Sequence, residues 1–553
     1  MFINNSVNFL SQNLFFYTIT KIRSILVFTR NFFQCFRRRG IMKVVFHQFV
    51  SIYCFIKNLV GIPPGFLKKE SGFVGLLIQT CLVTLSIITM TVLNVFMLII
   101  QCFLWGMDLW LTCKLGNNYG GRLQGLDGYF ESTEEKIGVA CMIILNHNED
   151  DFTLKKRVQE MFKTVHNSSY KLSCTVERCL GYAYYLKNQL TSEDCFNINN
   201  VSNKECLSRE ELFEYIENKY MINLCNQKRL WYGEIFTQPI LWDKENKSQK
   251  QTAILFVFRH CLGDGPSLLG LLNNVMVHKE QPEPMQLNAR NKTVPTFTLD
   301  YTYFYRNPLS NQIDEPAFQT PHNKRHVVFY LEDKIKYIPI IKKLKNKLQV
   351  GFGEILMAGL TASLANILAK RGKVMDKCTT SIILKPIDED IINGTYDHNN
   401  ITNKSTGIFI NALVSMQKGS SMLDRIKSIK IEVEKSKRSV DSLAIQTFSK
   451  LLHLIPTSLI KYIGAITSNI TAGLSNIGGL QTVSLAGCDI KAVMMFTPFL
   501  QNIGFRLHVF SYENRLQLAL SLKENMVRSR EEAQEIIDNI FVYVDKLSEE
   551  LNI

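Results

Sequence analysis

The longest hydrophobic feature of the sequence is a run of 35 residues, Phe73 to Met107, that contains no charged side chain. About 20 apolar residues cross the hydrocarbon core of a bilayer, so the run predicts a transmembrane segment. As one straight helix it would be about 52 Å long, and would have to tilt, extend past the interface or break into a re-entrant pair. No Pro or Gly lies between Leu76 and Trp105, which favours one long helix.

After this run, apolar positions follow strand and helix periodicities in turn. Residues 137–145 are typical of a strand and residues 152–165 of a helix, which predicts a mixed α/β lobe. Residues 279–325 hold six prolines without sustained periodicity, as expected of a crossover between two lobes. We therefore divide the chain into a basic membrane-proximal region (1–72), a transmembrane segment (73–107), an N-terminal lobe (120–278), a crossover linker (279–325) and a C-terminal lobe (326–553).

The second lobe has clear local signals. Leucines recur on one face of a helix predicted over 353–370, and Ser529 with Glu532 predicts a capping box before a C-terminal helix. Residues 505–522 alternate around a turn and predict a hairpin with one buried face. On this reading His508 lies on the polar face and is solvated.

The most informative stretch is residues 251–276, where an apolar strand pattern meets a glycine-containing turn and a leucine-patterned helix. His260 stands where the strand ends, so its imidazole can point into a cleft. Gly263 and Gly265 are expected to supply backbone angles that larger residues avoid. Asp264 can turn back to brace the loop.

A neutral imidazole suits one reaction in particular, the removal of a proton from an alcohol as it attacks a thioester. Because a thiolate is a good leaving group, no covalent acyl-enzyme is required and a single histidine suffices. On the pattern alone, however, a histidine at the end of a strand is more often an ordinary loop residue.

Residues 260–265 resemble the HHxxxDG motif of the CoA-dependent acyltransferase superfamily, with the second His, the Asp and the Gly in register. The chain from about 120 to 549 resembles the wax ester synthase / diacylglycerol acyltransferase branch. Its further resemblances, in chain order, are an opening strand from Leu126-Asp127 to Ile144, an "RPLW" element at Arg229-Leu230-Trp231, an "SNvpGP" loop at Ser475 to Gly479 and an "SYnG" turn at Ser511-Tyr512.

The resemblance implies an α/β fold of two lobes like that of chloramphenicol acetyltransferase, with a tunnel between the lobes. It implies that His260 is the catalytic base, that Asp264 and Gly265 are structural, and that Ser475 and Asn476 either form a turn or line the tunnel. Two departures stand out. Arg259 replaces the first His of the motif, and its charge is expected to favour a neutral His260.

The second departure is Gly353-Glu354, which replaces an Asn-Asp pair at the start of a second-lobe helix. It leaves open a catalytically inactive lipid-binding homologue. The expected function is nonetheless transfer of an acyl group from acyl-CoA to a lipid alcohol, either diacylglycerol or a long-chain fatty alcohol, by a membrane enzyme. An acyltransferase with a different acceptor is the alternative within enzymes.

Charge and cysteine content indicate which binding partners and cofactors to expect. The net charge is +14, and residues 1–72 carry ten Lys or Arg against one acid, so anionic lipid explains the basic excess better than nucleic acid does. The 14 Cys lack metal-ligand spacing, and we expect buried free thiols, no metal and no cofactor apart from acyl-CoA as substrate.

Topology is open to two interpretations. The positive-inside rule puts the basic flank in the cytosol, so a single crossing would put the lobes in the lumen. Cytosolic acyl-CoA favours lobes that face the cytosol at the endoplasmic reticulum. Sequons such as Asn167 and Asn291 do not decide between them.

Overall fold

The computed structural model describes residues 73–553 except 133–137, 200–204, 218–227, 243–249, 274, 279–324, 373, 385–400, 405, 417–419, 439–448, 461–469, 481, 498–502 and 524–525. The predicted crossover linker up to residue 324, with Asn291, therefore lies outside the described residues, and Arg325 begins a strand. The chain forms two units, Met1–Ile100 and Gln101–Ile553.

The uncharged run forms a single helix, α4, over Phe73–Leu115. This confirms one long helix and extends it by two turns beyond the run. By length and composition two described helices could span a bilayer, Asn94–Asn118 within the α4 region and Phe352–Lys370. Only 17% of the first is buried inside the structure against 72% of the second, so the second is a core helix.

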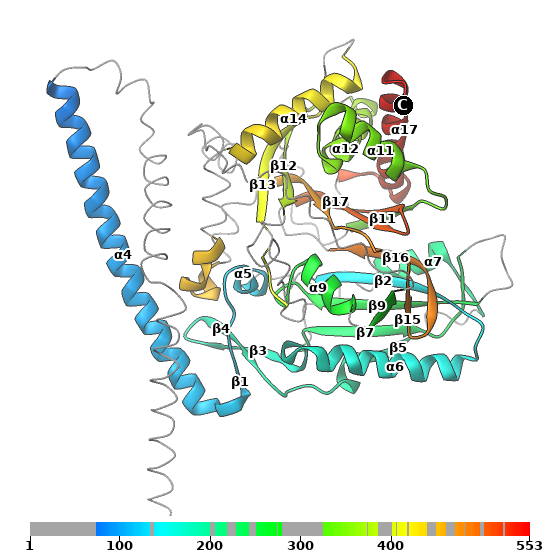
Figure 1. Ribbon diagram of the computed structural model, residues 1–553, viewed down its shortest axis with the longest axis horizontal. Helices are drawn as coiled ribbons and strands as arrows, with labels where there is room; N and C mark the ends of the chain where they lie inside the picture. Colours follow the sequence, from blue (N-terminus) through cyan, green and yellow to red (C-terminus); the bar gives the residue numbers. More distant parts are fainter. Residues whose placement is uncertain are drawn as a thin grey trace, which may run out of the picture. The chain divides into compact units, whose positions relative to one another are not determined.

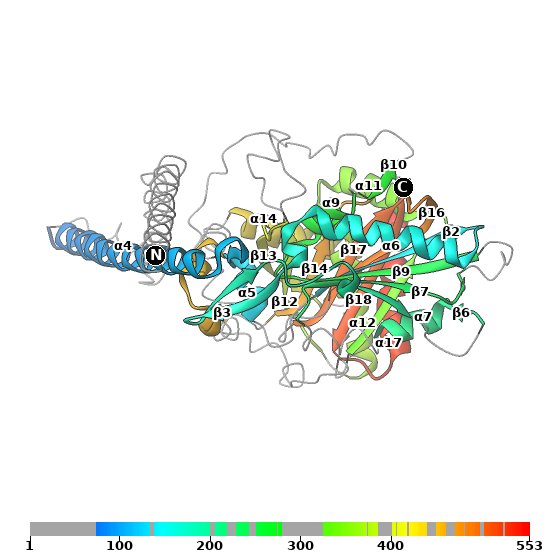
Figure 2. The same cartoon turned by 90° about the horizontal axis from the view of Figure 1, so that it is seen from below.

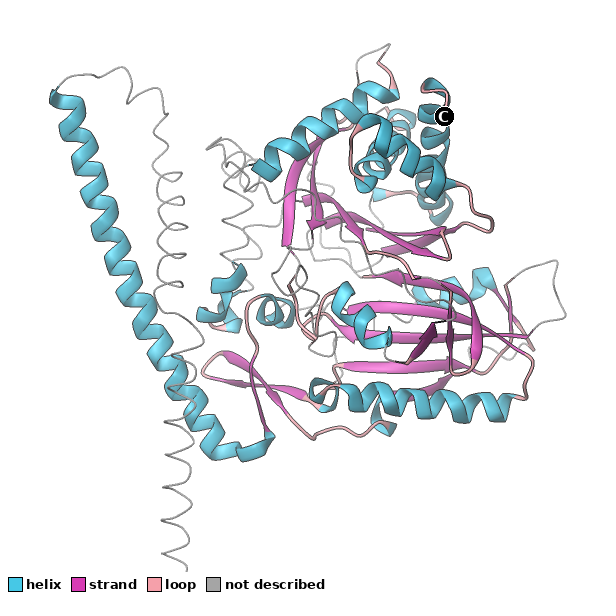
Figure 3. Cartoon of the chain, in the orientation of Figure 1, coloured by secondary structure: helices cyan, strands magenta, loops and turns pink. Residues whose placement is uncertain are grey.

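The first lobe is built on a seven-stranded sheet with the order β10-β15-β16-β2-β9-β7-β5 (Figures 1 and 3). Its strands are β2 (Gly138–His147), β5 (Phe196–Asn199), β7 (Trp231–Phe236), β9 (Lys250–Arg259), β10 (Met276–His278), β15 (Val483–Leu485) and β16 (Cys488–Phe496). Helices α6 (Asp151–Ser168) and α9 (Gly265–Asn273) pack on it. Trp231 is buried in this core and donates from Nε1 to the carbonyl of Leu172 at 3.0 Å.

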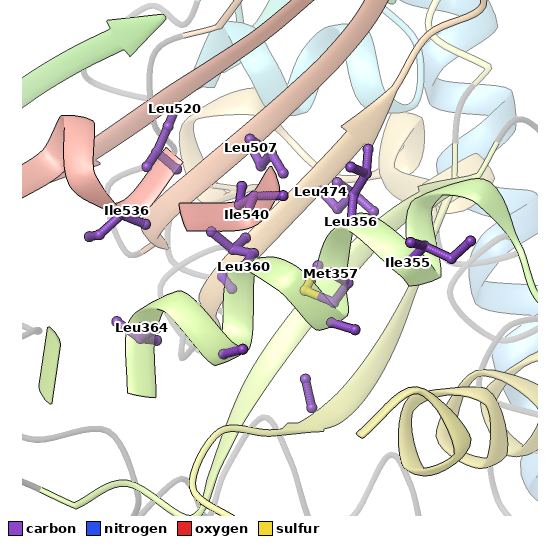
Figure 4. Close-up of a cluster of buried hydrophobic side chains, with 14 of the residues drawn as sticks. Ile355, Leu356, Met357, Leu360, Leu364, Leu474, Leu507, Leu520, Ile536 and Ile540 are labelled. Carbon is purple, nitrogen blue, oxygen red and sulfur yellow. The ribbon is translucent and has the colours of Figure 1, made fainter. Parts of the chain in front are cut away.

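The second lobe has a six-stranded sheet with the order β11-β18-β17-β14-β12-β13. Its strands are β11 (Arg325–Leu331), β12 (Lys377–Leu384), β13 (Thr406–Leu413), β14 (Ile470–Asn476), β17 (Ile503–Tyr512) and β18 (Arg515–Lys523), and its helices are α11 (Tyr337–Leu348), α12 (Phe352–Lys370), α14 (Met422–Arg438) and α17 (Arg530–Glu550). In Figure 4, Leu356 and Leu360 of α12 gather with Ile540 of α17 and Leu507 of β17. Each buried leucine of this kind contributes roughly 2 kcal/mol to folding.

The two sheets do not follow the chain order strictly. Strands β15 and β16 come from the C-terminal half of the sequence, yet β16 pairs with β2 in the first sheet. The sequence did not indicate this exchange, because short apolar strands carry no signal for their partner. It leaves β17 beside the first lobe, where Phe510 joins the first-lobe core.

Smaller elements complete the unit. They are the three-stranded sheet β1 (Tyr119–Arg122), β4 (Tyr182–Leu186) and β3 (Thr175–Cys179), the pair β6 (Leu207–Ser208) and β8 (Ile240–Leu241), helices α5 (Leu126–Ser132) and α7 (Arg209–Tyr215), and short 3₁₀ turns at Gly116–Asn118, Tyr170–Ser173, Glu193–Cys195 and Leu452–Leu454. Figure 2 gives a second view of the sheets with α6 and α9. Six of the ten described cysteines are buried, and all ten are free thiols.

Three local predictions need correction. The β17–β18 hairpin forms, but both of its faces are buried, because α12 and α17 cover one face and the first lobe meets the other. The predicted opening strand begins as helix α5, and its described strand is β2, residues 138–147. Ser529 caps α17 by accepting from the Glu532 N–H, but the Glu532 carboxylate accepts from Arg528 N at 2.5 Å.

Candidate active site

The loop between β9 and α9 carries the strand-end histidine. Strand β9 is buried from Gln251 to Arg259, and His260 follows it directly. Asp264 is buried, and its carboxylate accepts from the N–H of Ser267 at 3.1 Å and from the N–H of Lys404 at 3.0 Å. The first bond caps α9, and the second holds residues 402–404 against the loop. Asp264 is thereby a structural brace.

The glycines of this loop have a different role from the expected one. Neither Gly263 nor Gly265 has a positive φ. A Cβ at Gly263 would lie 2.5 Å from Cγ2 of Ile401, and one at Gly265 would lie 2.4 Å from Cδ1 of Ile477. Close packing therefore disfavours a side chain at Gly263, and at Gly265 the Ile477 side chain would have to move. The expectation of unusual backbone angles is wrong.

Asn403 fixes the orientation of the His260 ring. The Asn403 Nδ2 donates to the carbonyl of His260 at 2.6 Å and to Oδ1 of Asp127 at 2.8 Å, so its Oδ1 faces the ring. That oxygen lies 3.0 Å from Nδ1 of His260. Because an amide oxygen only accepts, Nδ1 carries the proton and Nε2 has the free lone pair. No described residue forms a hydrogen bond with Nε2.

A buried network supports Asn403 from behind. Asp127 also accepts from the Asn403 N–H at 3.3 Å and lies 3.5 Å from Nζ of Lys171. Lys171 donates in turn to the carbonyl of Ile401 at 2.8 Å. Burial raises the pKa of Asp127, and the nearby Lys171 opposes that shift. These contacts join α5 to the segment that carries Asn403, and so hold the amide in one orientation.

The His260 ring is enclosed but not closed off. It stacks on Phe130 with ring centroids 3.8 Å apart, and part of its surface stays accessible between buried Arg259 and Cys261. Burial lowers the pKa of His260 to about 4, Arg506 adds to the shift, and Asp264 and Asn403 oppose it. The imidazole is therefore neutral at pH 7, the form that can accept a proton.

Arg259 does not supply the cation that was expected to act on His260. Its guanidinium pairs with the buried carboxylate of Glu131, which joins the end of β9 to α5. The arginine that lowers the pKa of His260 is Arg506 on β17. The expectation for Arg259 is wrong because a paired charge has little reach, and no sequence signal reported the pairing.

A second buried polar cluster lies on β17. Nε2 of His508 accepts from the N–H of Thr497 at 3.3 Å and lies 3.0 Å from its Oγ1. Arg506 donates to the same Oγ1 at 3.4 Å and has no acidic partner within the described part of the chain. Burial lowers the pKa of His508 well below its ordinary value, with a further contribution from Arg506. His508 is thus buried, and the prediction that it is solvated is wrong.

Ser475 and Asn476 end strand β14, where a loop was predicted. Ser475 is half-buried and opposite His508 in the strand register, and Asn476 is exposed. The next residue, Ile477, packs at Gly265. The strand end is therefore beside the histidine loop, and contact with substrate stays a prediction.

Gly353 and Glu354, which stand in place of the Asn-Asp pair, fit their surroundings. Gly353 leaves room for Leu474, whose Cδ2 would lie 2.8 Å from a Cβ at that position. Glu354 is buried and lies 3.6 Å from Nζ of Lys437. Neither residue is among the groups that contact His260.

Sequence reasoning missed Asn403, Phe130 and Arg506, and it treated Asp127 only as part of a strand. Asn403 stands in a polar stretch without periodicity, so nothing marked it from its neighbours. Arg506 was visible as a charge within an apolar strand. Such a charge indicates either a solvated face or a buried polar site, and only the packing of β17 distinguishes them.

Known proteins resemble this chain in part of its sequence and in its fold. Residues 403–541 match the family model of the WS/DGAT C-terminal domain, and no curated protein matches the chain significantly. The structure resembles a wax ester synthase/diacylglycerol acyltransferase from Marinobacter aquaeolei VT8, with a TM-score of 0.53 and 11% identity over 78% of this chain and 100% of that one. It also resembles a trichothecene 15-O-acetyltransferase from Fusarium sporotrichioides, with a TM-score of 0.52 and 13% identity over 77% and 94%.

At these identities the structural matches establish the fold, and the predicted α/β fold of two lobes is confirmed. The fold is thus the one seen in these two acyltransferase structures. Residues 403–541, which include Asn403 and most of the second lobe, match the C-terminal domain of the wax ester synthase / diacylglycerol acyltransferase family. The domain match and the fold together support an acyl-CoA-dependent O-acyltransferase.

Proposed function

We propose that the protein is a membrane-attached enzyme that transfers a fatty acyl group from acyl-CoA to a lipid alcohol, with His260 as general base. The acceptor is diacylglycerol or a long-chain fatty alcohol, and the product is triacylglycerol or a wax ester. The observation that carries the proposal is the free Nε2 of a neutral, partly exposed imidazole whose Nδ1 faces the Oδ1 of Asn403.

The reaction follows from that geometry. Nε2 of His260 takes the proton of the alcohol as the alcohol oxygen attacks the thioester carbonyl carbon. The tetrahedral intermediate collapses with cleavage of the carbon–sulfur bond. The leaving thiolate of coenzyme A then takes the proton back from Nε2, so the ester and the free thiol form while His260 returns to its neutral state.

Asn403 contributes by position. A histidine free to rotate, or protonated on Nε2, would present no lone pair to the alcohol. The Asn403 amide excludes that tautomer, because its oxygen accepts only from Nδ1–H. Ser475, at the end of β14 beside the loop, is the proposed donor to the thioester oxygen.

Exposed apolar side chains on α4 support a lipid as the acceptor. On α4, the apolar side chains of Ile88, Phe96 and Leu98 are more than half exposed. A bilayer would cover these side chains and dissolve both the lipid acceptor and the neutral-lipid product. We place the enzyme at the endoplasmic reticulum with its lobes facing the cytosol, where acyl-CoA is supplied.

The test is ester formation by membranes that contain the wild-type chain or His260→Ala, supplied with radiolabelled acyl-CoA and each acceptor. General acid–base catalysis contributes about 10²–10⁴-fold, and the variant should lose that much. Equal, background-level activity of both chains would instead support an inactive lipid-binding homologue. Glycosylation of the Asn167 sequon, on the exposed face of α6, would contradict the cytosolic placement.

A further inference from the structure

The last turns of α4 belong to the catalytic unit, since Gln101 to Leu115 lie within it. One face of this segment is packed. Leu104, Met107 and Leu111 are at most 5% exposed and recur at helical spacing. The end of the apolar helix is therefore docked on the unit that contains His260.

Polar contacts join this docked face to the catalytic unit. Asp108 accepts from Nε and Nη2 of Arg122 at 2.7 and 3.0 Å and from the hydroxyl of Tyr119 at 2.5 Å. Arg122 is buried, and a two-point arginine–carboxylate pair fixes direction as well as distance. We call Asp108, Tyr119 and Arg122 the Asp108 cluster. It fixes α4 to strand β1.

The opposite face of the same turns is apolar and exposed. Phe103, Trp105, Leu109 and Trp110 are 50, 42, 39 and 51% exposed, and we call these four side chains the tryptophan face. Nζ of Lys114 lies 4.9 Å above the ring of Trp110. The other two of the four tryptophans, Trp231 and Trp242, are buried in the first lobe.

This composition fits the surface of a bilayer. Tryptophan prefers the level of the lipid head groups, because its ring is apolar and its N–H is polar. A lysine at the end of an apolar helix can extend its amine toward water while its stem stays in lipid. The tryptophan face is also continuous along α4 with the uncharged run, which favours lipid over a protein partner.

We propose that the tryptophan face is a lipid-binding surface of the catalytic unit, seated at the head-group level, and that the Asp108 cluster holds the active site at a set distance from the bilayer. The positioning role of the Asp108 cluster rests on the proposed function, because it requires a lipid acceptor. The binding surface itself is independent of His260.

Tryptophan emission tests the surface directly. The full chain is reconstituted into phosphatidylcholine vesicles with bromine either near the head groups or deep in the acyl chains. Shallow bromine should quench about half of the emission, since two of the four tryptophans lie on this face. The matched control Trp105→Phe with Trp110→Phe should lose that quenching. Two outcomes would overturn the proposal. One is vesicle-bound wild-type protein whose emission is quenched by neither brominated lipid, and the other is a dimer that pairs through this face.

The Asp108 cluster is tested by comparing two acceptors. Arg122→Met should lower the turnover of diacylglycerol in vesicles while turnover of a short, water-soluble alcohol is retained, because the second acceptor needs no bilayer. Asp108→Asn, which keeps the bond from Tyr119, should have a smaller effect. Equal loss on both acceptors would reject the positioning role. Absence of activity on both acceptors in the wild type would instead reject the proposed function and leave the quenching result standing.

Discussion

Two histidines of the molecule, His260 after β9 and His508 on β17, differ in which ring nitrogen has a hydrogen-bond partner. His260 has Nδ1 opposite an amide oxygen and leaves Nε2 free, whereas His508 has Nε2 engaged by Thr497. Burial lowers the pKa of both. A lowered pKa alone therefore does not identify a base. The free nitrogen and the accessible edge distinguish His260 as the group that can receive a proton from a substrate.

The largest difference in activity is expected between a variant that lacks the imidazole of His260 and one that lacks the imidazole of His508. His260→Ala should lower kcat/KM by about 10²–10⁴-fold, as expected for loss of a general base. His508→Gln, which keeps an acceptor for the Thr497 N–H, should stay close to wild type in steady-state assays with saturating acyl-CoA. The reverse ranking would assign the reaction to His508.

Asn403 is the next residue to change, because its amide oxygen faces Nδ1 of His260 and leaves Nε2 free. Asn403→Leu should lower kcat by about 10–100-fold with a smaller change in KM, since the base is misoriented while the substrate passage is kept. Asn146→Leu serves as the control, because Asn146 is a half-buried asparagine that accepts from Gln251 and not from His260. If kcat is unchanged, the amide does not set the tautomer.

The pH dependence of kcat/KM reports on Arg506. Since the pKa of His260 is lowered to about 4, the base form is complete at pH 7 and activity should fall only as pH falls through about 4. Arg506→Met removes the cation and should move this limb toward the ordinary value near 6.5, so activity at pH 5 drops while activity at pH 7.5 is affected less.

Arg506→Lys keeps the charge and should leave the acid limb near that of the wild type. Arg515→Met, which removes a cation paired with Glu513 at the turn of the same hairpin, is the control for charge elsewhere. A limb that stays in place in Arg506→Met would show that burial alone sets the pKa of His260.

The smallest effect on activity is expected at Thr497. Thr497→Val removes the hydroxyl that contacts His508 and Arg506 and should lower the free energy of unfolding by roughly 1–3 kcal/mol. Denaturant unfolding measures this change. Ester formation by the folded variant should be nearly unchanged, and a large loss would give the His508 cluster a part in the reaction.

Much of the fold was predictable because the periodicities were strong. The helix at 353–370, the strand at 251–259 and the hairpin around residue 513 all have apolar positions at regular spacing. Helices α4 and α12 are both apolar, yet the sequence distinguished them, since only α4 lacks charge over 35 residues. Strand exchange by β16 escaped prediction because pairing is decided by packing between lobes.

The site was predictable only in part. His260 and Asp264 stand in a motif with fixed spacing, so sequence could find them. Asn403 is 143 residues from His260, and its role depends on two hydrogen bonds that no local pattern encodes. Likewise, the burial of Arg506 follows from the contact between β17 and the first lobe and not from its own strand.

Chemical modification of the wild-type enzyme can show which histidine is the base. Diethyl pyrocarbonate reacts with accessible, neutral imidazoles, and peptide mapping identifies each modified histidine. We expect that loss of ester formation follows modification of His260 at Nε2, that acyl-CoA protects it, and that His508 stays unmodified while activity is lost. Full activity with His260 modified, or inactivation that follows His508 instead, would contradict it.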